Sequence, residues 1–88
     1  MLAILLGFGL LGEGSAQEGL TADQLRQTGW EASRRGAFSE AIVRWERAAQ
    51  IYGQAGNRGA EADLLAQMAD AYAALGRYAK AVEYFDRA

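Results

Sequence analysis

The 88-residue chain contains no cysteine, no histidine and no proline, and lysine occurs once, as Lys80. Without cysteine there is no disulfide framework, no thiolate zinc site and no acylated cysteine of the lipoprotein kind. Without histidine and cysteine, the usual general base, thiol nucleophile and zinc ligands are missing. Ser15, Ser33 and Ser39 have no activating base nearby in the sequence. We therefore expect a chain that is not an enzyme and that uses no cofactor or metal.

The chain also lacks an excess of positive charge. Its net charge of −2 argues against nucleic-acid binding, which needs a basic stripe, and against a polybasic membrane patch. Apolar residues make up 51% and charged residues 23%, as in a folded chain long enough for one small domain. Few residues are β-branched and alanine is abundant, which favours helices throughout.

The longest apolar run covers residues 1–11 and is shorter than the roughly 20 residues that a membrane-spanning helix needs. We therefore expect no stable membrane span. The length fits the hydrophobic region of a secretory signal, about 7–15 residues. The G-x-G-x-x-G run at 7–12 lacks the helix and the second strand that dinucleotide binding requires.

Small residues follow the apolar run and predict cleavage after Ala16, so that 1–16 is a signal peptide and 17–20 a linker. The protein would then be exported, either periplasmic or secreted, and otherwise cytoplasmic. No basic residue precedes the run, since the first is Arg26. Either the true start lies upstream, or the segment is a disordered or loosely helical tail.

The rest of the chain repeats itself with an offset of forty residues. The first set of matching positions is Gly36, Phe38, Ala41, Ile42, Trp45 and Ala48, and the second is Gly76, Tyr78, Ala81, Val82, Phe85 and Ala88. A fixed period in this range is typical of solenoid arrays, which present surfaces to partners and seldom carry chemistry. The repeat therefore predicts partner binding.

Capping signals divide this part into four helices. Thr21 and Gln24 form a capping box for the first helix, and Gly36 can take the left-handed conformation that ends it. Ser39 can cap the second helix, which fades over residues 53–56, and Asn57 can cap the third. The fourth helix is expected from about residue 79 to the end.

The residues inside each helical hairpin predict close packing. Gly29 and Ala69 on the first helices would let the backbones approach, as would Ala41 and Ala81 on the second. Large side chains would fill the gaps beside them, namely Phe38, Trp45, Tyr78 and Phe85. On the surface we expect two i, i+4 ion pairs, Glu40 with Arg44 and Glu83 with Arg87.

The pattern Gly-x-aromatic-x-x-Ala-aliphatic-x-x-aromatic-x-x-Ala resembles the tetratricopeptide repeat. The resemblance covers roughly residues 22–88 and implies an all-α solenoid of two antiparallel hairpins, with units at 21–57 and 58–88. Two features depart from the family: its usual period is thirty-four residues, and Gly53 stands where a proline usually ends the second helix. The longer period resembles bacterial repeats that often precede a CHAT peptidase-like domain.

The resemblance also implies a partner-binding groove on the first helix of each hairpin. Carried over by position, its residues are Asp23, Arg26, Gln27, Trp30, Arg34, Asp63, Gln67 and Asp70. Trp30 lies off the helix face that carries Leu25, Gly29 and Ala32, and arginines are close to it in the sequence. Tryptophan and arginine often occur together at binding hot spots. Alternatively, Trp30 packs against a neighbouring helix or the N-terminal segment. The groove lacks the Lys/Asn set of the carboxylate clamp, so capture of a peptide C-terminus by that device is not expected.

Two functions from different classes remain open. The chain is either a non-catalytic protein-protein interaction scaffold of an exported bacterial protein, or the N-terminal fragment of a larger protein with a downstream enzymatic or signalling domain. The last helix has no C-cap signal, and arrays generally need about three repeats. The ending therefore implies truncation or self-association through the uncapped C-terminal helix. The expected partner is a protein or peptide.

Overall fold

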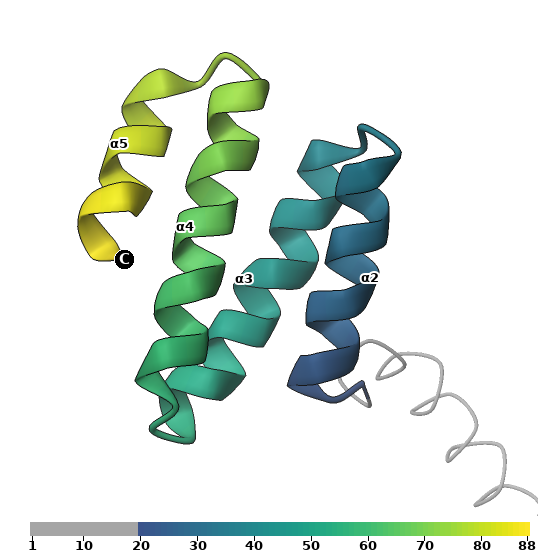
Figure 1. The fold of residues 1–88 in the computed structure, drawn as a ribbon, viewed down its shortest axis with the longest axis vertical. Coiled ribbons are helices and arrows are strands. Elements are labelled where there is room, and N and C mark those ends of the chain that lie inside the picture. Colours follow the sequence, from purple (N-terminus) through teal and green to yellow (C-terminus); the bar gives the residue numbers. More distant parts are fainter. Residues whose placement is uncertain (1–19) are drawn as a thin grey trace, which may run out of the picture.

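The structure, a computed structural model, describes residues 20–88, and these form four helices and no strand. The helices are α2 (Ala22–Arg34), α3 (Phe38–Gln54), α4 (Arg58–Ala74) and α5 (Tyr78–Arg87). Consecutive helices run antiparallel and lie side by side in chain order, and each packs on the next (Figure 1). The prediction of an all-α fold is confirmed. The expected signal peptide lies outside the described residues, and no helix within 20–88 is long and apolar enough to cross a membrane.

The three turns between the helices share one construction. Each has a glycine with positive φ, at Gly36 (79°), Gly56 (80°) and Gly76 (78°), twenty residues apart. The N–H of the residue after each glycine donates to a carbonyl five residues back, which is the Schellman arrangement. These bonds are Ala37 to Ala32 (2.9 Å), Asn57 to Tyr52 (2.8 Å) and Arg77 to Tyr72 (2.8 Å). The left-handed conformation predicted for Gly36 is confirmed, and the turn recurs at half the forty-residue period.

The N-terminal caps agree with the sequence in two of three cases. Gln24 N–H donates to Thr21 Oγ1 (3.1 Å) and Thr21 N–H donates to Gln24 Oε1 (2.9 Å), so the capping box is confirmed. Asn57 Oδ1 accepts from the N–H of Ala60 at 3.2 Å. The prediction that Ser39 caps α3 was wrong. The Schellman turn brings the next helix in directly, so α3 begins at Phe38 and has no side-chain cap.

Trp45 is the centre of the core and is only 2% exposed. Its indole lies against the backbone of α2 at Gly29, where a Cβ would come within 2.5 Å of Trp45 Nε1. The same Nε1 donates to the carbonyl of Arg26 at 3.1 Å. The prediction that Trp45 fills a gap in the hairpin is therefore confirmed, whereas at Gly29 the ring of Trp45, and not a second backbone, occupies the space.

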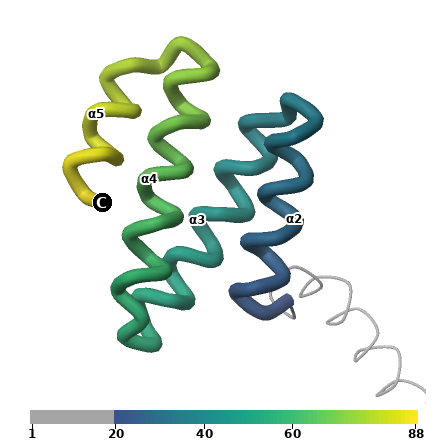
Figure 2. Tube along the Cα trace, viewed as in Figure 1, coloured from purple at the N-terminus to yellow at the C-terminus, as the bar shows by residue number. Residues whose placement is uncertain are grey.

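The second half of the repeat is packed differently from the first. Tyr78, Val82 and Phe85 are 69%, 59% and 49% exposed, so the prediction that Tyr78 and Phe85 fill gaps was wrong. Within residues 20–88, α5 has a helix on one side only (Figure 2), and Phe85, which corresponds to Trp45, lies on a face that this helix does not cover. Tyr84 is buried instead, against the ring of Tyr72 at 5.1 Å between centroids.

One of the two expected surface ion pairs forms. Arg44 Nε lies 3.4 Å from Glu40 Oε2, as predicted. Glu83 instead pairs with Lys80 at 3.9 Å, and the guanidinium of Arg87 lies 4.8 Å from the centroid of the Tyr84 ring. Because Tyr84 is buried beneath Arg87, the guanidinium can lie on its ring. This contact competes with an ion pair to the solvated carboxylate of Glu83.

Candidate functional site

The chain order of the helices creates a surface pocket between α2 and α4, with α3 as its floor. This α2/α4 pocket has a volume of about 110 Å³. Its lining residues are Trp30 and Ser33 of α2, Phe38 and Trp45 of α3, and Gln67, Asp70 and Ala71 of α4. The pocket thus brings together side chains from Trp30 to Ala71, which lie 41 positions apart in the sequence (71 − 30 = 41).

The two tryptophans form the aromatic side of the pocket. Their rings meet edge to face, with centroids 6.4 Å apart and planes at 64°. Trp45 is fixed by its hydrogen bond to the backbone of Arg26, whereas Trp30 is 50% exposed. Trp30 therefore packs on a neighbouring helix through Trp45, as the alternative interpretation expected, and half of its surface remains open.

Gln67 and Asp70 supply the polar side of the pocket. They are three residues apart on α4, so they lie on the same face of the helix. Gln67 Oε1 is buried and has no hydrogen-bond partner among residues 20–88. Asp70 is exposed and makes no ion pair within the same range. The Asp70 carboxylate can accept hydrogen bonds from a ligand, and Gln67 Oε1 is a second acceptor, which solvent does not reach in this structure.

Asp23 and Arg26 form a separate cluster with Tyr52 of α3. The Tyr52 hydroxyl donates to Asp23 Oδ1, and Arg26 Nη2 lies 3.8 Å from the same carboxylate. The Arg26 guanidinium lies 5.6 Å from the centroid of the Tyr52 ring. Burial raises the pKa of Tyr52 above its ordinary 10.0, and the hydrogen bond to Asp23 raises it further. These side chains therefore already have partners in the fold.

The remaining predicted residues do not join the pocket. Gln27 and Asp63 are exposed on α2 and α4. Arg34 lines a shallow depression with Glu31 and Arg35. Of the eight residues predicted for the groove, the structure brings together Trp30, Gln67 and Asp70.

Four pocket residues stand outside the eight predicted for the groove, namely Ser33, Phe38, Trp45 and Ala71. Phe38 and Trp45 were assigned to the core, because their repeat positions are those of packing residues. The order of the helices could have predicted these residues. A groove between the first helices of two successive hairpins must have the helix between them as its floor.

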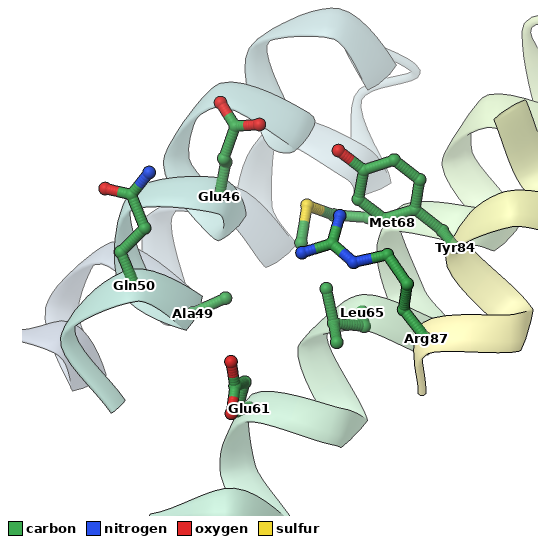
Figure 3. A pocket seen from close by; sticks show the side chains of 8 residues that line it. All are labelled: Glu46, Ala49, Gln50, Glu61, Leu65, Met68, Tyr84 and Arg87. Atoms are coloured by element: carbon green, nitrogen blue, oxygen red, sulfur yellow. The ribbon is translucent and has the colours of Figure 1, made fainter. Parts of the chain in front are cut away.

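A second pocket lies between α3 and α5, with α4 as its floor, and has a volume of about 100 Å³ (Figure 3). Its residues are Glu46, Ala49, Gln50, Glu61, Leu65, Met68, Tyr84 and Arg87. Arg87 extends over Leu65 and Met68 toward the side of Glu46, and Glu61 pairs with Arg58 at 3.6 Å. This α3/α5 pocket thus contains the guanidinium of Arg87. No pattern in the sequence predicted the pocket.

Within residues 20–88 no group of three or more histidine, cysteine, aspartate or glutamate side chains could hold a metal ion. Comparison of the chain with protein-family models, with curated proteins and with solved structures found no match. The case for a function therefore depends on the repeat and on the two pockets.

Proposed function

We propose that the chain is a non-catalytic protein-protein interaction module of the tetratricopeptide type, and that its partner binds on the α2/α4 face. The observation that carries this proposal is the α2/α4 pocket itself. It joins a half-exposed tryptophan, Trp30, to acceptors of Gln67 and Asp70 that have no partner within residues 20–88. An exposed tryptophan over a rigid aromatic floor is typical of binding hot spots.

The size of the pocket favours a side chain of a partner over a free small molecule. Pockets for small ligands usually measure about 300–1,000 Å³, and the α2/α4 pocket measures about 110 Å³. That volume accommodates the end of one side chain. The rest of the partner would lie along the exposed surfaces of α2 and α4, where Gln27 and Asp63 are found.

The turn geometry supports the solenoid part of the proposal. The three Schellman turns recur every twenty residues, so α2–α3 and α4–α5 are joined in the same way. A repeated hairpin places equivalent helices side by side and produces an extended face for partners.

Selection of peptides from a random phage-displayed library on the full chain tests this function. We expect selected peptides to lose binding to Trp30→Ala and to Asp70→Arg, with unchanged affinity for Tyr78→Ala, an exposed aromatic on α5. Thermal melts of each variant separate a lost site from a lost fold. Selection of no peptide, or equal loss in Tyr78→Ala, would count against the proposal.

A further inference from the structure

The hydrogen-bonding groups of the α2/α4 pocket call for a ligand rich in donors. Asp70 offers a carboxylate and Gln67 offers the buried Oε1 without a partner in residues 20–88. A buried acceptor that lacks a hydrogen bond is unfavourable, and a donor from the ligand would satisfy it. Ser33 can donate or accept. The acceptors of the pocket therefore suit a group with several N–H donors.

The chain itself shows which group its aromatic rings hold. Guanidinium carbons of three arginines lie over tyrosine rings, Arg26 over Tyr52 (5.6 Å), Arg77 over Tyr72 (5.4 Å) and Arg87 over Tyr84 (4.8 Å). Trp30 is half exposed and has no such cation among the described residues. Indole is the aromatic ring that binds cations best. The exposed ring of Trp30 is therefore a free site for a cation among the described residues.

The α3/α5 pocket is the counterpart of the α2/α4 pocket, displaced by one twenty-residue step. Three of its residues, Gln50, Leu65 and Arg87, stand twenty positions after Trp30, Trp45 and Gln67. In the α3/α5 pocket Arg87 supplies a guanidinium from within the chain (Figure 3). In the α2/α4 pocket the shorter and neutral Gln67 takes that position. The α2/α4 pocket thus has the acceptors and the ring, and no cation of residues 20–88 lines it.

The nearby cations of α2 leave the pocket accessible. Arg26 is held by Asp23 and by the Tyr52 ring. Arg34 lies in the depression that it shares with Glu31 and Arg35. A cationic group can therefore approach from α4, where Asp70 is the charged residue of the pocket lining.

From these observations we infer that the α2/α4 pocket binds the guanidinium of an arginine side chain in the partner. This inference rests on the proposed function and names the ligand chemistry of the same site. The Trp30 indole stacks on the guanidinium plane, and Asp70 and Gln67 Oε1 accept its N–H groups. A guanidinium is planar and has N–H donors at its edges, so it can stack on the indole and donate to acceptors beside the ring at the same time. The compact ammonium of lysine does this less well.

A pair of blocked tripeptides tests the inference on the full chain. One is acetyl-Gly-Arg-Gly-amide, and the other has citrulline, which keeps the shape of arginine but is neutral. Binding is measured by tryptophan fluorescence. We expect the arginine peptide to bind at least about tenfold more tightly than the citrulline peptide, because charge-assisted hydrogen bonds and cation-π contacts need the charge. Asp70→Asn should remove most of that preference. Asp86→Asn, an exposed aspartate on α5, should leave it unchanged.

Equal affinity for the two tripeptides, or an equal effect of Asp70→Asn and Asp86→Asn, would overturn the inference. The library selection separates its failure from that of the proposed function. Selected peptides that need Trp30 but show no arginine preference would refute the ligand chemistry and leave the binding face intact. Selected peptides that ignore Trp30 would refute both.

Discussion

At the scale of single residues, Gly29 and Trp45 define the packing between α2 and α3. The indole of Trp45 occupies the space that a side chain at position 29 would need, and its N–H donates to the backbone beside it. Small residues at helix contacts were expected from the sequence. Trp45 was expected to fill a gap beside such residues, but the sequence did not show that its ring would lie directly on Gly29 in place of a second backbone.

Gly29→Ala should destabilise the fold by about 1–3 kcal/mol, as overpacking in a core does. The free energy of unfolding in urea, followed by helical circular dichroism, measures this. In a Trp45→Phe background the same substitution should be less destabilising, because the smaller ring leaves room for the methyl group. A penalty that is unchanged in that background would show that the contact with Trp45 is not the cause.

Tyr52 and Tyr72 make stability depend on pH above the ordinary tyrosine range. Burial is the main cause that raises both pKa values above 10.0, with Asp23 adding to the first and Tyr84 to the second. The folded state therefore retains these protons when the unfolded state begins to lose them. Their contribution to stability is complete below about pH 10 and is lost as the pH rises through the raised pKa values.

We expect the urea midpoint to fall between pH 9 and about pH 11. A Tyr52→Phe/Tyr72→Phe chain should lose less stability over that interval than the wild type. Tyr78→Phe is the matched control, because Tyr78 is 69% exposed and the substitution should leave the pH dependence as it is. The interpretation fails if the double variant follows the wild-type curve.

At the scale of elements, the three Schellman turns decide where each helix begins and ends. Gly36 and Gly76 were predictable as repeat partners, but Gly56 was missed because the forty-residue comparison aligns each first helix only with another first helix. The same turn explains why Ser39 is not a cap. Local capping preference places a helix start at Ser39, and the turn geometry sets it at Phe38.

Gly56→Ala should destabilise the chain by about 1–2 kcal/mol, because the left-handed conformation is unfavourable for a residue with a Cβ. No atom of the part of the chain that the structure describes lies within 4 Å of the added methyl group, so a clash with it does not contribute. Gly59→Ala is the control three residues later, inside α4 and also without near neighbours. It should stabilise by about 0.5–1 kcal/mol. Thermal melts that shift in the same direction for both variants would contradict the role assigned to Gly56.

At the scale of the whole molecule, equivalent positions of the repeat have unequal surroundings. Trp45 has helices on both sides and is buried, whereas Phe85 stands at the end of the described array and is 49% exposed. The repeat pattern predicts the same helix geometry at Trp45 and at Phe85. A pattern within one repeat unit cannot show whether a neighbouring helix covers either side chain. For the same reason three of the eight groove residues meet in a pocket and the others do not.

Trp45→Ala should therefore reduce the free energy of unfolding by about 3–5 kcal/mol, a large share of the stability of a chain this small. Phe85→Ala at the matching repeat position should reduce it by about 1 kcal/mol or less, as is usual for partly exposed sites. Urea unfolding of the two variants gives the comparison. Similar losses would mean that the outer face of α5 is covered in solution.

The account depends most on the α2/α4 pocket as the place where a partner binds. The two indole N–H signals in a nitrogen-15 NMR spectrum test this directly, since Trp30 is open and Trp45 is hydrogen-bonded inside the fold. Addition of a library-selected peptide should shift the Trp30 indole signal and the Gln67 side-chain amide most. The largest shifts at Gln50 and Tyr84 in the α3/α5 pocket, with Trp30 unmoved, would contradict the account.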